Sequence, residues 1–367
     1  MGVSNHTISK EPLHIAFCAN DRFLPGLAVA LHGALLNLPQ GCDVGVHIID
    51  AGLSADSKVG ICQRYNNRSD IEIEFLDWPR DLFARIVTTK YHISAYLRLA
   101  LPKLLNVSRV VYLDSDMIVF DDVRFLIREI DSSRFALAAV PDWETKTLKQ
   151  DSEVIAARVK MEACNTYFNS GAMALNLDLL RSEEFTERAL DLLGDFGEHA
   201  GLADQTAFNA LLAEKWHALP SSWNMPSWAF DQQKNNMLPE ILHYTNSAPW
   251  LKRQYTPSQA LFERIAGDLG VELPRPETSM TSSCTGAFLV WLLAPLRIVY
   301  NLLRAAMSNA LGKREKADAS QSIASHWLEY FVGGPIRVLR YRKRIREIKS
   351  PSFDPFVRKV HTLNLSI

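Results

Sequence analysis

Short β-branched runs alternate with longer amphipathic segments through the first half of the chain. The apolar runs end on polar residues and predict strands at residues 14–20, 44–50, 71–77, 109–114, 134–140 and 171–177. Apolar residues at spacings of three and four predict helices at residues 26–37, 55–66, 94–105, 179–196 and 203–213. This alternation predicts an α/β fold with a Rossmann-like, mostly parallel sheet flanked by helices.

Polar side chains close the first four predicted strands: Asn20, Asp50, Asp77 and Asp114. The carboxyl ends of parallel strands lie along one edge of a sheet, and ligands of such folds bind outside that edge. We therefore expect the chemistry of this protein to be concentrated there.

Length and composition predict a folded main domain with an appendage. The chain has 367 residues, of which 47% are hydrophobic and 22% charged, and a Pro/Ser/Thr-rich stretch at 273–285 predicts a linker. We expect a main domain at 13–272 and a helical C-terminal region at 286–367. The net charge is −1, but residues 277–367 hold 14 Lys and Arg against 6 Asp and Glu. A chain without a global basic field is not expected to bind nucleic acid.

The run Val110-Val-Tyr-Leu-Asp114-Ser-Asp116 is the strongest chemical signal in the sequence. Two carboxylates on the turn after a buried strand can bind a divalent cation such as Mg²⁺ or Mn²⁺, with coordination positions left for a diphosphate. The structural alternative is a turn that merely ends the strand, because Asp and Ser favour turns.

Further motifs accompany this one in a fixed order, at residues 91–99, 167–177, 202–209, 219–224 and 241–250. In this order the set resembles the retaining family 8 glycosyltransferases, over about residues 13–255, and implies a GT-A fold for residues 13–272. Several separated motifs in one order are more specific than any single motif.

The resemblance implies a role for each matched residue. Asp114, Asp116 and His243 would bind Mn²⁺, with Mg²⁺ as the alternative, on the diphosphate of a UDP-sugar. Asp204 and Gln205 would act at the transferred hexose, and Asp142 would meet the acceptor, a glycan or lipid-linked saccharide. The remaining donor contacts implied are Ala19, Asn20, Asp21, Arg98, Ser115, Asn169, Gly171 and Lys252.

The terminal motif, which begins at His243, departs from the family pattern. It is one residue short and lacks the glycine and the lysine that normally neutralises the diphosphate, so Lys252 or Arg253 would have to replace that charge. Gln205 is a poor nucleophile. Retention is therefore expected through same-face attack by the acceptor on an oxocarbenium-like centre.

The C-terminal region predicts membrane contact. Residues 337–349 form a basic amphipathic run, with Trp291, Trp327, Tyr330 and Phe331 in the same region, which is typical of helices that lie on anionic membrane surfaces. A helical hairpin packed on the body is the alternative. Five widely spaced cysteines and a polar start predict a cytoplasmic protein, peripheral on the inner face of the membrane.

Two other functions fit parts of the sequence. A phosphatase of the haloacid dehalogenase type also has an apolar strand followed by Asp-x-Asp, although near the start of its domain. The incomplete terminal motif would also suit a non-catalytic protein that binds nucleotide sugars.

Overall fold

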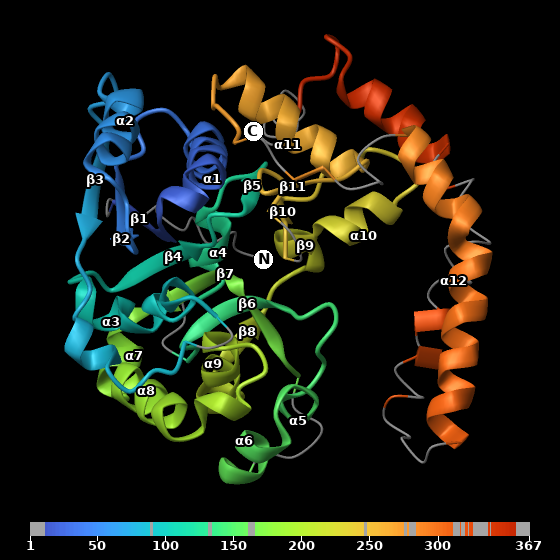
Figure 1. The fold of residues 1–367 in the computed structure, drawn as a ribbon. Coiled ribbons are helices and arrows are strands. Elements are labelled where there is room, and N and C mark those ends of the chain that lie inside the picture. The colour runs from blue at the N-terminus through green and yellow to red at the C-terminus, as the bar shows by residue number, and fades with distance from the viewer. Residues whose placement is uncertain are drawn as a thin grey trace, which may run out of the picture. The chain divides into compact units, whose positions relative to one another are not determined.

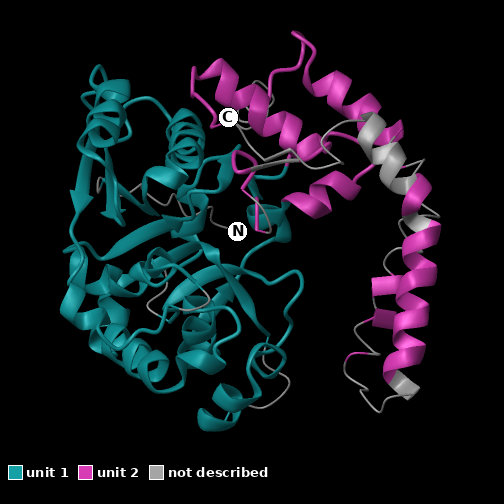
Figure 2. Ribbon diagram, in the orientation of Figure 1, with its two compact units in different colours: residues 1–226, 239–243, 359–367 teal, residues 227–238, 244–358 magenta. Residues whose placement is uncertain are grey.

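The computed structural model describes residues 12–88, 91–130, 134–160, 166–245, 248–274, 277–278, 284–310, 316, 320–321, 323–325, 337 and 339–356. The chain divides into two compact units (Figure 2). Unit 1 comprises residues 1–226, 239–243 and 359–367, and unit 2 comprises residues 227–238 and 244–358.

Unit 1 is built around a seven-stranded sheet in the order β3-β2-β1-β4-β7-β6-β8 (Figure 1). Every neighbouring pair is parallel except the two that β7 makes with β4 and β6, so the predicted mostly parallel sheet is confirmed. The strands are β1 Leu13–Ala19, β2 Val44–Asp50, β3 Ile71–Leu76, β4 Arg109–Leu113, β6 Leu137–Pro141, β7 Phe168–Asn176 and β8 Trp216–Ala218.

Helices cover both faces of this sheet because its central strands are apolar on both sides. In β4, Tyr112 packs in one core cluster and Val111 in the other. The first cluster includes side chains of α3 Leu101–Leu104, α5 Leu148–Asp151, α6 Glu153–Arg158, α7 Leu177–Ser182, α8 Phe185–Phe196 and α9 Asp204–Leu212. The second includes side chains of α1 Leu24–Leu36, α2 Ala55–Tyr65 and α4 Arg124–Arg128.

Two of the predicted helices are broken. Residues 94–105 form the 3₁₀ turns η3 Ile93–Ala95 and η4 Leu97–Ala100 before α3, where Pro102 occupies the first turn. Proline lacks the N–H that a continuous helix would need there. Residues 179–196 are split between α7 and α8, because Glu184 takes a left-handed backbone conformation with φ 51°. The remaining 3₁₀ turns of unit 1 are η1 Asp21–Phe23, η2 Arg80–Phe83, η5 Gly197–His199 and η6 Ser221–Asn224.

A small three-stranded sheet, in the order β5-β10-β9, supports the edge where β4 ends. Its strands are β5 Met117–Val119, β9 Met225–Pro226 and β10 Ile241–His243. Helix α1 lies directly on β5, since a Cβ added to Gly33 would lie 2.4 Å from the Val119 carbonyl oxygen. The antiparallel pairing of β5 with β10 sets His243 opposite Met117.

Unit 2 contains α10 Ser227–Gln232, β11 Lys252–Arg253, α11 Pro257–Asp268, β12 Glu277–Thr278 and α12 Cys284–Ala310, and residues 339–348 are also helical. β11 and β12 pair in parallel. The β12 strand falls inside the stretch that the sequence assigned to a linker. Trp327, Tyr330 and Phe331 lie outside the described residues.

The basic run near the C-terminus packs within unit 2. Arg344 is 1% exposed, donates to the backbone carbonyls of Phe230 and Asp231, and stacks on the Phe230 ring at 4.6 Å. Ile345 and Ile348 are buried with it. The apolar side of this helix is thus used in packing, as in the hairpin alternative.

A search of the described residues finds no helix of sufficient length and apolar character to span a bilayer.

Candidate active site

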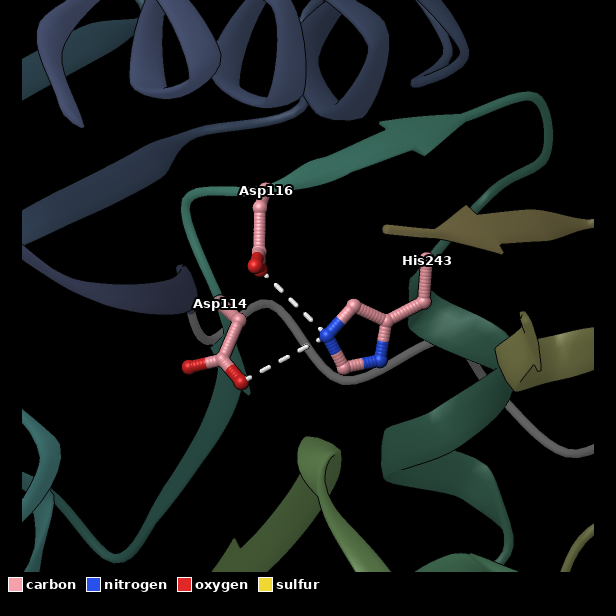
Figure 3. Close-up of side chains that lie close together, drawn as sticks. All are labelled: Asp114, Asp116 and His243. Carbon is pink, nitrogen blue, oxygen red and sulfur yellow. Dashed lines mark ion pairs between the residues drawn. The ribbon is translucent and has the colours of Figure 1, made fainter. Parts of the chain in front are cut away.

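Three potential metal ligands converge at the end of β4. Asp114 follows β4, Asp116 precedes β5, and the β5–β10 pairing brings His243 beside them (Figure 3). His243 Nε2 lies 3.3 Å from Asp116 Oδ1 and 3.7 Å from Asp114 Oδ2. One ligand atom from each residue lies within 4.8 Å of the others, the only such group among the described residues.

Gly171 provides the room that this cluster needs. A Cβ at this position would lie 2.4 Å from His243 Cε1 and 2.8 Å from Asp114 Oδ2. The Asp114 N–H also donates to the Gly171 carbonyl at 2.8 Å, which joins the end of β4 to the start of β7. Any side chain at residue 171 would displace the candidate ligands.

Arg98 links the two acidic parts of the site. Its guanidinium is buried and pairs with Asp114 at 2.8 Å and with Asp204 at 3.2 Å. It also donates to the Ser170 carbonyl at 2.9 Å and lies over the Tyr112 ring, 4.5 Å from its centroid. The arginine therefore compensates two carboxylates that water reaches poorly.

Asp142 and Gln205 face each other across the start of β7. Asp142 Oδ2 accepts from Gln205 Nε2 at 3.2 Å and from Asn169 Nδ2 at 3.1 Å, and its Oδ1 caps the following turn. Gln205 Oε1 accepts the Ser170 N–H at 3.0 Å. Both ends of the Gln205 amide are thus engaged. Ala203, just before Asp204, has φ 54°, a strained conformation of the kind that clusters at functional sites.

The loop after β1 shapes the adjacent part of this edge. Asn20 caps η1, and Asp21 Oδ1 accepts from the Ser54 N–H at 3.0 Å and the Ser57 hydroxyl at 2.7 Å. Ala19 ends β1, and the Ser115 hydroxyl donates to the Cys18 carbonyl at 2.8 Å. These contacts hold the β1 loop against the Asp114–Asp116 turn.

Burial and charge perturb the acids and the histidine of the site. Burial raises the pKa of Asp204 to about 6 although Arg98 opposes the shift, and burial likewise raises the pKa of Asp114. Burial by itself would lower the pKa of His243, but the carboxylates of Asp116 and Asp114 reverse the effect, and the pKa is raised. Groups perturbed in this way concentrate at functional sites.

The donor set fits a divalent transition metal. Carboxylate oxygens are hard ligands that Mg²⁺ and Mn²⁺ share, and an imidazole favours Mn²⁺ of the two. The carboxylate oxygens of Asp116 and Asp114 lie 3.3 and 3.7 Å from His243 Nε2, so this position attracts positive charge. A cation with open coordination sites would satisfy all three groups.

The comparisons with known proteins identify the family. Residues 14–254 match the model of glycosyl transferase family 8. The chain belongs to this family. This family 8 protein is therefore an enzyme, a hexosyltransferase.

Its relatives include general stress protein A of Bacillus subtilis, 27% identical over 59% of this chain and 75% of the relative. The lipopolysaccharide 1,2-glucosyltransferase of Escherichia coli is 25% identical over 68% of this chain and 76% of the relative. The solved galactosyltransferase LgtC, in complex with donor and acceptor sugar analogues, superposes with a TM-score of 0.59 at 23% identity. That match covers 72% of this chain and 98% of LgtC and confirms the GT-A type of fold. The comparisons do not favour the phosphatase alternative.

The structure gathers most of the sequence-predicted site residues of this family 8 enzyme in unit 1, at the edge where β1 and β4 end. Lys252 and Arg253 form β11 in unit 2, and their side chains lie outside the described residues. Sequence reasoning missed Tyr112, whose hydroxyl donates to Asp114 at 2.9 Å. It also missed Ser170, whose hydroxyl donates to Asp204 at 3.1 Å, and Asn224, whose Oδ1 lies 2.9 Å from His243 Nδ1. All three residues lie inside motifs recognised in the sequence, and that position is the signal that could have found them.

Proposed function

We propose that this enzyme is a retaining, Mn²⁺-dependent transferase that moves galactose or glucose from a UDP-sugar to a glycan or glycolipid acceptor. The observation that carries the proposal is the convergence of Asp114, Asp116 and His243 within 4.8 Å, beside buried Asp204 and Gln205. The lipopolysaccharide glucosyltransferase among its relatives supports the acceptor class.

Each group in the site has a chemical task under this proposal. A bound divalent ion supplies charge stabilisation for the departing diphosphate. Asp114, Asp116 and His243 hold it, and Arg98 fixes the carboxylates of Asp114 and Asp204. Asp204 orients donor hydroxyls, and Asn169, which donates to Asp142, lies near the sugar.

In this scheme Gln205 shapes the site near the anomeric carbon and is not a nucleophile. Its amide oxygen already accepts the Ser170 N–H and its amide nitrogen donates to Asp142, so both ends of the side chain are held in place. A neutral amide oxygen is also a poor nucleophile. The acceptor hydroxyl instead attacks on the face from which UDP leaves, and the departing phosphate oxygen takes its proton. Gln205→Ala should slow transfer and keep the α-configured product, and a sugar trapped covalently on residue 205 would contradict this scheme.

A screen of UDP-sugars for Mn²⁺-dependent release of UDP tests the activity. We expect UDP release with UDP-galactose or UDP-glucose, lost with a chelator and restored by Mn²⁺. UDP binding without release from any donor, with saccharide acceptors present, would favour a non-catalytic sugar-binding protein. Release that is indifferent to metal would refute the ligand assignment.

We also propose that α12 docks on an anionic membrane surface where a lipid-linked acceptor is presented. A stripe of its apolar side chains at spacings of three and four is 38–68% exposed: Leu292, Leu293, Leu296, Val299, Tyr300, Leu303 and Met307. Leu302, outside this stripe, is also exposed. On the opposite side, Asn301 and Ala305 are buried. Arg297 and Arg304 are exposed, and α12 has no acidic residue. An anionic lipid surface complements this helix better than a second copy, which would bring like charges together.

Vesicle sedimentation separates the two contributions to docking. Leu296→Gln with Leu303→Gln removes two apolar contacts, each worth ~2 kcal/mol when buried, and should weaken binding to zwitterionic and anionic vesicles alike. Arg297→Gln with Arg304→Gln should weaken only the salt-sensitive binding to anionic vesicles. Val59→Gln, at an apolar position of unit 1 that is 52% exposed, is the control. Negligible binding of the unmodified enzyme to both vesicles would refute the docking.

A further inference from the structure

Asn224 lies behind the candidate metal ligands without belonging to them. It ends η6, is 2% exposed, and its backbone carbonyl accepts from Trp143 Nε1 at 3.1 Å. Its side-chain Oδ1 lies 2.9 Å from His243 Nδ1, and its Nδ2 donates to Asn169 Oδ1 at 2.8 Å. One buried amide therefore touches both the ligand histidine and the amide beside Asp142.

The orientation of this amide follows from a backbone donor. The Gly171 N–H can only donate, and it donates to Asn169 Oδ1 at 3.0 Å, which identifies the oxygen of that side chain. The same oxygen must then face the nitrogen of Asn224, so the oxygen of Asn224 faces His243. Asn169 Nδ2 continues the chain of bonds to Asp142.

This orientation determines how His243 can bind an ion. An amide oxygen only accepts hydrogen bonds, so Nδ1 of His243 carries a proton, and Nε2 is the nitrogen directed at Asp114 and Asp116. A hydrogen bond from the second ring nitrogen commonly fixes the orientation of a metal-binding histidine, and losing it typically costs about 10–100-fold in metal affinity.

We propose that Asn224 is a positioning residue that holds His243 with Nε2 toward the metal and connects the metal site to Asn169 and Asp142. Its side-chain oxygen accepts from His243 Nδ1 and so orients the metal ligand, and its side-chain nitrogen donates to Asn169 on the sugar-binding side. The inference rests on the proposed metal-dependent function. If it is correct, metal binding through His243 and the connection to Asn169 can be disrupted separately by different substitutions of Asn224.

Asn224→Ala removes both bonds, whereas Asn224→Asp keeps an acceptor for His243 Nδ1 and loses the donor to Asn169. Affinity for Mn²⁺ is measured by calorimetry with UDP present, and pulsed EPR detects the nitrogen coupling of the His243 imidazole to bound Mn²⁺. We expect Asn224→Ala to bind Mn²⁺ about 10–100-fold more weakly with a changed nitrogen coupling. Asn224→Asp should keep the coupling and the affinity but lower kcat.

Asn209→Ala is the matched control. Asn209 is also 2% exposed in unit 1, but among the described residues its side chain bonds only to the backbone of Phe168 and Gln205. It should lose stability as Asn224→Ala does and keep wild-type nitrogen coupling to Mn²⁺.

An Asn224→Ala protein with unchanged Mn²⁺ affinity and unchanged nitrogen coupling would overturn the inference. If that variant fails to fold, Asn224→Asp decides, because loss of the nitrogen coupling in a folded Asp variant would equally overturn it. Absence of Mn²⁺ binding by the unmodified enzyme would instead refute the proposed metal-dependent function.

Discussion

Arg98 and Arg85 make a matched pair for measuring what burial does to the site. Each guanidinium pairs with two carboxylates of unit 1, Arg98 with Asp114 and Asp204, and Arg85 with Asp191 and Asp195. The Arg98 side chain is 9% exposed and the Arg85 side chain 58%. The two arginines therefore differ strongly in burial, and Arg98 in addition donates to the Ser170 carbonyl and lies over the Tyr112 ring.

The loss of unfolding free energy on replacement by methionine should be several kcal/mol larger for Arg98 than for Arg85. Arg98→Met leaves two buried carboxylates without their partner, and breaking a buried pair in this way costs about 3–5 kcal/mol. Arg85→Met removes exposed pairs, which contribute about 0.2–1 kcal/mol. Stability is best followed by hydrogen exchange on peptides from β4 and β7, in the presence of a chelator, because the two units need not unfold together.

The loss in Arg98→Met should depend on pH and on metal. Burial already raises the pKa of Asp204 to about 6 with Arg98 present, and removing the arginine raises it further. A raised folded-state pKa penalises folding increasingly from the unfolded-state pKa upward and fully above the folded-state pKa. Because Asp204 is protonated below about pH 6 in both proteins, the extra loss in the variant begins above that pH and should be larger at pH 8 than at pH 5. Mn²⁺ should recover part of it by neutralising Asp114. Equal losses in the Arg98 and Arg85 variants, or a loss independent of pH, would refute this electrostatic account.

Three further predictions concern the metal ligands. Asp116→Asn should leave the fold nearly unchanged while Mn²⁺-dependent turnover falls by orders of magnitude, and retained activity with unchanged metal affinity would contradict its role as a ligand. Gly171→Ala should weaken Mn²⁺ binding in calorimetry because its Cβ overlaps His243, whereas Gly60→Ala, which meets nothing within 4 Å, should not. Mn²⁺ affinity should rise as pH rises through the raised pKa of His243, since the ion must displace its proton; a flat profile would exclude His243 as a ligand.

The sheet and its functional edge could be predicted from the sequence because local pattern decides them. The strand ending at Asp114 is a continuous apolar run, as expected for a strand buried on both faces, and β4 ends one residue before that aspartate. The start of β7 also lies at this edge, because β7 runs antiparallel to β4 and brings Gly171 beside Asp114. The order of the motifs predicted that these two segments meet. Hydrophobic periodicity alone could not have predicted this contact.

The rest of the site depends on contacts between distant segments. Strands β5, β9 and β10 have only two or three residues each, too few for a periodic signal, yet their pairing delivers His243 to the two aspartates. The bond between Asn224 and His243 likewise requires η6 and β10 to lie side by side. A sequence motif can identify such residues as candidates, but it does not predict how their side chains are oriented.

The C-terminal region shows why amphipathicity alone does not identify a membrane helix. Residues 337–349 and α12 both combine cations with apolar side chains, and the sequence predicted docking for the C-terminal region that contains both. In the structure, Ile345 and Ile348 of that run are buried within unit 2, and Arg344 satisfies three backbone carbonyls there, so these side chains are not available to lipid. Helix α12 buries its polar Asn301 and exposes its leucines, the reverse of a helix packed by its apolar side. The exposed apolar area, which costs free energy in water, therefore favours α12 as the docking element.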